Sequence, residues 1–87
     1  MELEQLRAFV AVAETGSFTR AAERLYTSHS SISRAVSSLE RELGVLLIER
    51  DNRVFGLTKA GQTLLSGAND LLEREEKLKM QLKTSDY

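Results

Sequence analysis

The chain has 87 residues, which is the size of one domain, since domains commonly run to about 100 to 150 residues. Its 41% hydrophobic and 29% charged residues are typical of a globular protein and exclude a disordered chain. Twelve basic and thirteen acidic residues give a net charge of −1, so the total charge does not indicate a polyanionic partner. The absence of cysteine excludes disulfide frameworks, thiolate metal sites and thiol nucleophiles, and no cofactor or metal is expected.

Two helices are predicted in the first 25 residues. Apolar residues at steps of three and four predict the first helix, which Gly16 ends: Leu3, Leu6, Phe9, Val10 and Ala13. Ser17 is a suitable N-cap for a second, shorter helix, whose apolar residues are Phe18, Ala21, Ala22 and Leu25.

A third helix is predicted over residues 29–43. Ser28 is its expected N-cap and Gly44 its left-handed C-cap. The residues expected to face the core are Ile32, Val36, Leu39 and Leu43. At 100° per residue, the side chains expected to point outward are Ser30, Arg34, Ser37 and Arg41, with Ser31, Ser33 and Ser38 beside them.

The pattern changes after Gly44. Residues 45–48 and 54–57 are short apolar runs of β character, separated by Asp51-Asn52, and they predict a two-stranded hairpin. Thr58 can cap a last helix, predicted from about Lys59 to about Lys83. A heptad seam runs along this helix through Leu64, Ala68, Leu71, Glu75, Leu78 and Leu82. Such a helix outruns a small core, so the seam is interpreted as a dimer contact, with cover for the core as the alternative.

The outward face of the third helix is the predicted binding surface. Six serines occur between Ser28 and Ser38, although serine is a mediocre helix former. No acid lies between Glu23 and Glu40, and the acids concentrate on the first and last helices, which are expected to point elsewhere. Short hydroxyls and an arginine allow a helix to approach a DNA duplex, and only local positive potential is needed for that. Arg34 is therefore the leading candidate for DNA contact, with a solvated arginine as the alternative.

Several motifs in order carry a family resemblance. They are residues 8–14 (AFVAVAE), 16–22 (GSFTRAA), Leu25, Ser33-Arg34, Leu39-Glu40, Leu43-Gly44, Glu49-Arg50, Leu57-Thr58 and Ala60-Gly61. The chain resembles the amino-terminal DNA-binding segment of the LysR-type transcriptional regulators over essentially its whole length. The resemblance implies a mainly α, winged helix-turn-helix fold of three helices and a hairpin wing, followed by a long linker helix. It also implies a homodimer on double-stranded DNA that reads the halves of an interrupted inverted repeat.

The resemblance also assigns residues. It places His29, Ser30, Ser33 and Arg34 where the family's third helix enters the major groove, and Arg53 where the wing reaches the minor groove. The family usually has glutamine at His29 and proline at Ser30, and a histidine cannot reproduce the bidentate pairing of glutamine with adenine. Family members continue into an effector-binding domain, so a small-molecule effector, and a possible tetramer, depend on a region outside this chain.

Further site residues follow from position alone. Ser37 lies on the outward face, and Ser28 is expected to serve mainly as a cap, leaving phosphate contact to a backbone N–H. Thr19, at the start of the second helix, is a candidate phosphate contact. Arg50 either contacts DNA or forms an internal ion pair, and His29 is either a base contact or a neutral surface residue. The predicted dimer contacts are Leu64, Ala68, Leu71, Leu78 and Leu82.

Two other functions are alternatives to DNA binding. A dimerisation or protein-docking module would fit the acidic last helix, and its binding would not depend on salt. An enzyme using Ser33 with His29 lacks a nearby carboxylate and an oxyanion pocket, so the chain is predicted not to be an enzyme. The expected division is residues 1–57 for the DNA-binding unit, 58–83 for the dimerisation helix and 84–87 for a frayed tail. With no membrane-spanning run and an acidic amino terminus, the protein is expected to be cytoplasmic.

Overall fold

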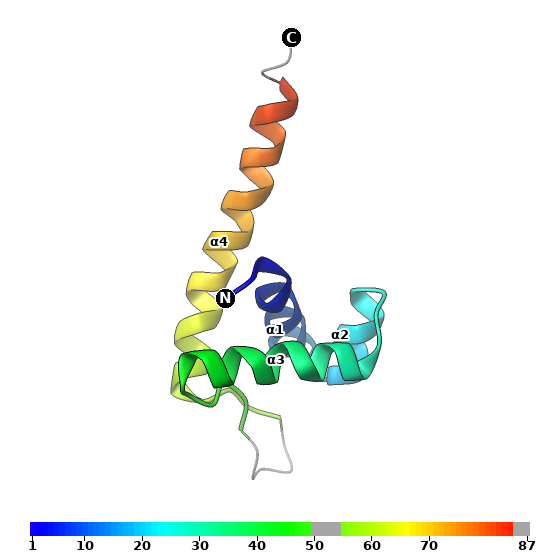
Figure 1. Cartoon of the computed structure of the whole chain (residues 1–87), viewed down its shortest axis with the longest axis vertical. Helices are drawn as coiled ribbons and strands as arrows, with labels where there is room; N and C mark the ends of the chain where they lie inside the picture. The colour runs from blue at the N-terminus through cyan, green and yellow to red at the C-terminus, as the bar shows by residue number, and fades with distance from the viewer. Residues whose placement is uncertain (50–54, 85–87) are drawn as a thin grey trace.

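The computed structural model describes residues 1–49 and 55–84 and contains four helices in this part of the chain. They are α1 (Leu3–Thr15), α2 (Phe18–Arg24), α3 (His29–Leu43) and α4 (Lys59–Thr84). The first three form a globular end, and α4 runs from the base of this end far beyond it, so the molecule measures 53 × 25 × 20 Å (Figure 1). None of the helices in the described ranges is long and apolar enough to cross a membrane.

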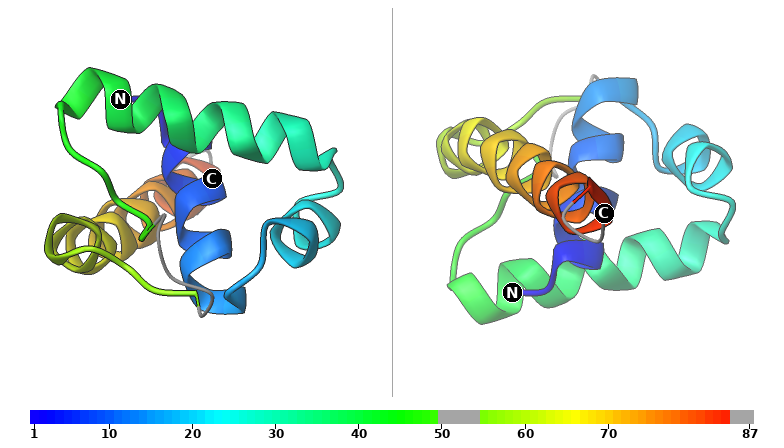
Figure 2. Two further views of the ribbon diagram at one scale, coloured as in Figure 1. Left: turned by 90° about the horizontal axis from the view of Figure 1, so that it is seen from below. Right: turned by 90° about the horizontal axis from the view of Figure 1, so that it is seen from above.

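Helix α1 lies at the centre of the globular end. It contacts α2, α3 and α4, and the two end-on views show it between them (Figure 2). For this reason α1 is buried on more than the one face that its periodicity predicts. Its buried residues are Leu6, Ala8, Phe9, Val10, Ala11 and Val12. Ala21 and Ala22 of α2 are also buried, and their small side chains permit close packing.

The predicted helix ends are confirmed. Gly16 and Gly44 adopt left-handed conformations, with φ of 69° and 71°, at the C-caps of α1 and α3. The hydroxyl of Ser17 accepts a hydrogen bond from the Arg20 N–H, and the hydroxyl of Ser28 accepts one from the Ser31 N–H. These local signals fix where α2 and α3 begin, and hence the turn between them.

A buried carboxylate organises the segment after α3. Glu40 is 8% exposed, and one of its oxygens accepts hydrogen bonds from the backbone N–H groups of Leu47 (2.7 Å) and Ile48 (3.3 Å). The side chains of Leu47 and Ile48 are thereby held in the core. Periodicity places Glu40 beside the core face of α3, but it does not reveal that a carboxylate there binds the next segment.

In the described residues, the predicted hairpin is represented by one pair of residues, one from each of its two apolar runs. One antiparallel bridge joins Ile48 to Leu57, with a hydrogen bond of 2.9 Å from the Glu49 N–H to the Gly56 carbonyl. A strand needs several consecutive bridges, and residues 1–49 and 55–84 contain this single one. The apolar run at 45–48 is also only half buried, because Leu46 is 55% exposed.

Helix α4 begins and ends close to its predicted bounds. The hydroxyl of Thr58 accepts from the Gly61 N–H at 3.0 Å, which confirms Thr58 as a cap. At the other end the helix includes Thr84, whose hydroxyl donates to the Gln81 carbonyl at 3.0 Å. Thr84, which was expected in the frayed tail, therefore belongs to the helix.

One predicted core position and two positions of the predicted dimer seam differ from the expectation. Leu43 is 40% exposed, and it is the last residue of α3. Ala68 of the predicted dimer seam is fully buried, and Leu64 is partly buried against the same core. This end of α4 packs against the chain's own domain, which is the alternative role considered for the seam.

Candidate nucleic-acid interface

The outward face of α3 carries residues that are predicted to contact DNA. Ile32, Val36 and Leu39 are buried on the opposite side. His29, Ser30, Arg34 and Arg41 are exposed, whereas Ser33 and Ser37 are half-buried. The structure thus brings these predicted residues of α3 to the accessible surface of one 15-residue helix.

The first turn of α3 is held by a hydroxyl network. The Ser28 hydroxyl accepts from the Ser31 N–H (3.1 Å), donates to the Ser31 hydroxyl (2.9 Å) and lies 3.3 Å from the Ser30 hydroxyl. It is therefore occupied within the helix, as its expected role as a cap requires. A helix of this length also presents backbone N–H groups at its amino terminus, which can bind a phosphate.

His29 lies against an aromatic ring that sequence reasoning did not single out. Its imidazole centroid is 5.7 Å from that of Phe18, and the two rings are tilted by 42°. Phe18 is the first residue of α2 and His29 the first residue of α3, so the contact joins the starts of two helices. The apolar stripe identifies Phe18 as a core residue only, and no spacing rule indicates its second contact.

Thr19 and its neighbour Arg20 are exposed on α2, as a phosphate contact would require. On the same helix, Arg24 forms an ion pair of 2.6 Å with Glu14 of α1. That pair reduces the contribution of Arg24 to positive potential.

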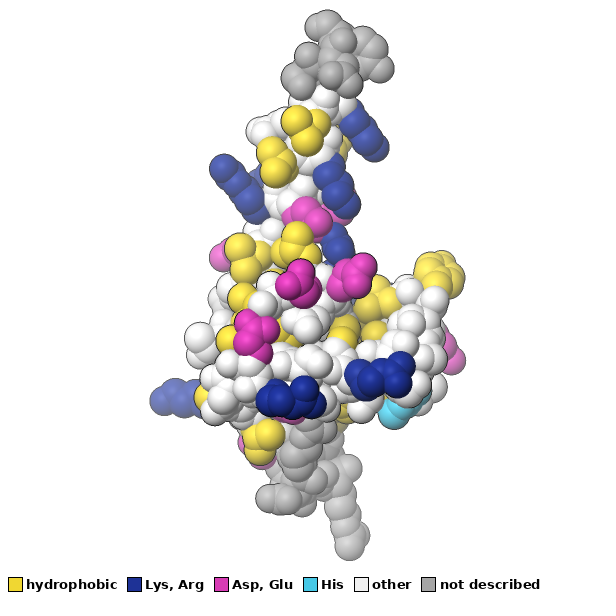
Figure 3. Space-filling model, in the orientation of Figure 1, with side chains coloured by type: hydrophobic (Ala, Val, Ile, Leu, Met, Phe, Trp, Pro, Cys, Tyr) yellow, Lys and Arg dark blue, Asp and Glu magenta, His cyan; other side chains and the backbone are white. Residues whose placement is uncertain are grey.

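The charged side chains of α3 differ in whether they form ion pairs. Arg34 and Arg41 form no ion pair with any residue in the described ranges. Figure 3 shows dark blue side chains and the cyan histidine along the lower edge of the globular end, with magenta acids above them. Glu42 of α3 binds the amino group of Met1 at 2.7 Å, and this hydrogen bond raises the pKa of that amino group above its usual 8.0.

One acid of α1 lines a groove together with α3. Glu4 and Arg34 both line an open groove of about 630 Å³, whose lining comes from α1, α3 and the turn before α3. This groove is not lined by the other outward-facing residues of α3, which are Ser30, Ser33, Ser37 and Arg41. Glu4 is therefore the acid of α1 that shares a groove with the predicted DNA-contacting residue Arg34.

The predicted dimer residues fall into two groups along α4. Ala68 has no exposed surface and is not available to a partner, while Leu64 is partly buried against the chain's own core. Leu71, Leu78 and Leu82 are exposed by 47%, 55% and 60%. Between Leu71 and Leu78, within the second group, Glu75 forms an ion pair with Arg7 of α1, so α4 contacts the globular end at least as far as Glu75.

Arg50 and Arg53, the two predicted wing contacts, lie outside the described residues.

The chain matches the model of a known family. Residues 3–62 match "Bacterial regulatory helix-turn-helix protein, lysR family". The chain therefore belongs to the lysR family of bacterial regulatory helix-turn-helix proteins, as the motifs in its sequence indicate.

Its relatives are named as regulators. The chain is 49% identical over 80 residues to the Hca operon transcriptional activator HcaR of Escherichia coli strain K12, covering 92% of this chain and 27% of HcaR. It is 49% identical over 76 residues to the transcriptional regulator ClcR of Pseudomonas putida, covering 87% of this chain and 26% of ClcR. The chain thus spans about a quarter of the length of these curated relatives, and they are regulators, not enzymes.

Solved structures include similar domains bound to DNA. The BenM DNA-binding domain in complex with catB site 1 DNA superposes with a TM-score of 0.91 at 39% identity, covering 97% of this chain and 93% of that one. The CbnR DNA-binding domain in a DNA complex gives a TM-score of 0.90 at 39% identity and full coverage of both chains. The four-helix arrangement is therefore that of LysR-family DNA-binding domains.

Proposed function

We propose that this chain is the DNA-binding domain of a transcriptional regulator and that it binds double-stranded DNA sequence-specifically. The observation that carries the proposal is the outward face of α3. It presents short hydroxyls and two arginines, Arg34 and Arg41, which have no ion-pair partner among residues 1–49 and 55–84. The DNA complexes of similar domains at 39% identity support the same partner.

In the proposed complex α3 occupies the major groove. That groove is about 12 Å wide and admits one helix. Arg34 donates a forked pair of hydrogen bonds to guanine, while Ser30, Ser33 and Ser37 contact phosphates or base edges. His29 contacts a base from the first turn, and Thr19 and the backbone N–H groups after Ser28 bind phosphates.

The hairpin wing completes the proposed interface. Its base is the Ile48–Leu57 bridge, and its predicted contacts are Arg53 at the minor groove and Arg50 at the backbone. In this division, residues 1–57 form the DNA-binding unit and 58–83 the dimerisation helix. A bacterial regulator of this kind works in the cytoplasm, where the chromosome lies.

The distal part of α4 supports a homodimer. From Leu71 onward it exposes three leucines at heptad-like spacing, on a helix that projects beyond the globular end. A second copy would cover these leucines, and a symmetric pair would read an interrupted inverted repeat. An effector-binding domain and a tetramer belong to the proposal only for a longer form of the protein.

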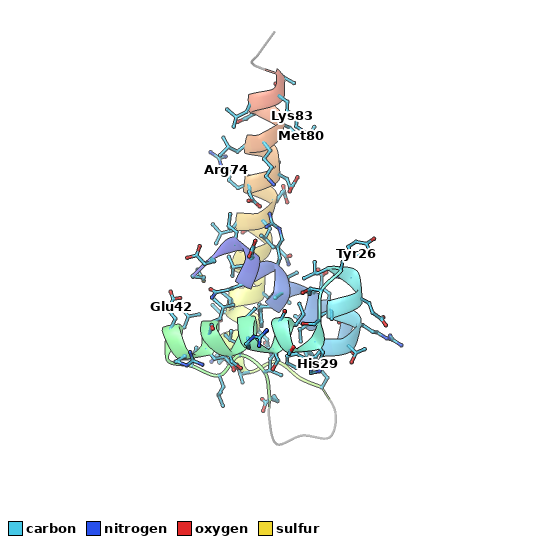
Figure 4. The ribbon with its side chains drawn as sticks, turned by 45° about the vertical axis from the view of Figure 1, so that its right-hand side comes forward. Tyr26, His29, Glu42, Arg74, Met80 and Lys83 are labelled. Atoms are coloured by element: carbon cyan, nitrogen blue, oxygen red, sulfur yellow. The ribbon has the colours of Figure 1, made fainter. Side chains whose placement is uncertain are left out.

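The test compares two exposed arginines. Arg34→Ala should weaken binding to a specific site by about 1 to 3 kcal/mol and relax the preference at one base position. Arg74 is also exposed but lies on the projecting part of α4, away from α3, so Arg74→Ala is the matched control (Figure 4). Fluorescence anisotropy at several salt concentrations measures both effects, because phosphate contacts give a steep salt dependence. If Arg34→Ala left binding unchanged, the proposal that α3 contacts the bases would be refuted. Binding that does not depend on salt would instead favour a protein-docking module.

A further inference from the structure

The first residues of α2 and α3 meet through their side chains. Ser17 caps α2 immediately before Phe18, and Ser28 caps α3 immediately before His29. The two aromatic rings lie 5.7 Å apart between centroids at a tilt of 42°. Both helix starts are thus fixed by hydrogen bonds, and the ring contact spans the turn between them.

The two rings differ in how firmly they are held. Phe18 is half-buried and packs against the hydrophobic core, so its ring has a fixed place. His29 is exposed at the start of α3, and Figure 4 shows it at the opposite end of that helix from Glu42. Phe18 therefore supports one side of an imidazole that is otherwise accessible to a ligand. Tilted aromatic pairs of this separation attract each other beyond the effect of burial alone.

The orientation of an imidazole determines which base atoms it can hydrogen-bond. A neutral histidine carries one donor and one acceptor on different ring nitrogens, so a rotation of the ring moves the N–H away from a given base atom. In the major groove, purines present the N7 acceptor, and guanine adds O6. A side chain already held in its binding orientation loses less conformational freedom on binding.

We propose that Phe18 is a positioning residue for sequence reading, which holds the His29 ring so that its N–H donates to a purine in the major groove. This inference rests on the proposed function, and it deepens it by naming the residue that sets one base preference. Phe18 itself does not contact DNA in this proposal. Its effect on binding passes entirely through His29.

The ring contact can be tested first in the 87-residue chain without DNA. A phenyl ring shifts the NMR signals of protons that lie beside it, so the His29 ring protons should move toward free-histidine positions in Phe18→Leu. Phe18→Tyr keeps the ring and should keep the shift. Circular dichroism melting of both variants checks that the fold is intact. Unshifted His29 signals in the wild-type chain would overturn the proposal.

Base preference is the second measurement. The wild-type chain and its variants select sites from a random DNA pool, and relative affinities are read at every position. Phe18→Leu should reduce discrimination about two- to tenfold at the one position that His29→Ala also affects. The double variant Phe18→Leu with His29→Ala should lose no more discrimination at that position than His29→Ala alone. Phe18→Tyr should retain the wild-type base preference.

The outcomes separate this inference from the proposed function. Failure of the wild-type chain to enrich any sequence would refute the proposed function, whatever the NMR result. If the wild-type chain enriches a site, and Phe18→Leu keeps the preference at the base that Arg34 contacts, the proposed function stands. A loss of affinity in Phe18→Leu that is equal for all sequences would then show that Phe18 has only a structural role. An unchanged preference in Phe18→Leu would equally overturn the positioning role.

Discussion

Gly61→Ala should destabilise the domain, because α4 and the segment after α3 lie too close together at Gly61 to admit a methyl group. A Cβ atom at Gly61 would lie 2.1 Å from the carbonyl oxygen of Leu47 and 3.3 Å from Cβ of Leu57. The oxygen is held in place, because it accepts from the Thr58 N–H at 3.1 Å and the Leu47 N–H donates to buried Glu40 at 2.7 Å. The first turn of α4 would have to move away from the core.

The magnitude follows from two opposing effects. Overpacking typically costs about 1 to 3 kcal/mol, and a clash with fixed backbone belongs at the upper end. Alanine gains up to about 1 kcal/mol over glycine inside a helix. The net loss is about 2 kcal/mol, which corresponds to a fall of roughly 8 to 16 °C in Tm for a domain of this size.

Gly67 of the same helix is the matched control. A Cβ there would meet nothing within 4 Å, so Gly67→Ala should gain about 0.5 to 1 kcal/mol and raise Tm by a few degrees. Thermal melting followed by circular dichroism, at one fixed protein concentration, measures both variants. A Gly61→Ala chain that melts at or above the wild-type temperature would refute this account of the α4 packing.

Two more predictions concern the buried carboxylate of Glu40 and the proposed dimer. Glu40→Ala removes the acceptor of two backbone N–H groups and should cost about 2 to 3 kcal/mol in urea unfolding, against at most about 1 kcal/mol for the exposed Glu42→Ala. Equal losses in the two variants would contradict the structural role of Glu40. Leu78→Ser with Leu82→Ser should raise the dissociation constant of the proposed dimer at least tenfold in analytical ultracentrifugation, since two leucines that are exposed in the single chain would no longer be covered by the second copy. Lys79→Ser is the control on the same helix, and an unchanged constant for the leucine variant would exclude the distal seam as the dimer contact.

Local signals in the sequence predicted the helix ends well. Ser17, Ser28 and Thr58 act as caps, and Gly16 and Gly44 adopt left-handed conformations, because each of these signals acts within a few residues of itself. The bounds of α3 were predicted without error for the same reason.

What the sequence did not predict depends on how the helices meet. Periodicity identifies the apolar face of α4, but only the packing of α1 determines that Ala68 is covered while Leu78 is not. Likewise, the place of Glu4 beside the groove that Arg34 lines and the contact of Phe18 with His29 join different helices. The spacing of residues within one helix does not predict contacts between different helices.

Two copies of this domain are proposed to bind a symmetric DNA site through α3. Selection of binding sites from a random DNA pool by the purified chain tests both the dimer and its sequence preference. We expect enrichment of an inverted repeat whose half-site centres lie one or more helical turns apart, at about 34 to 36 Å per turn. Enrichment of isolated half-sites would contradict the dimer, and no enrichment at all would contradict sequence-specific binding.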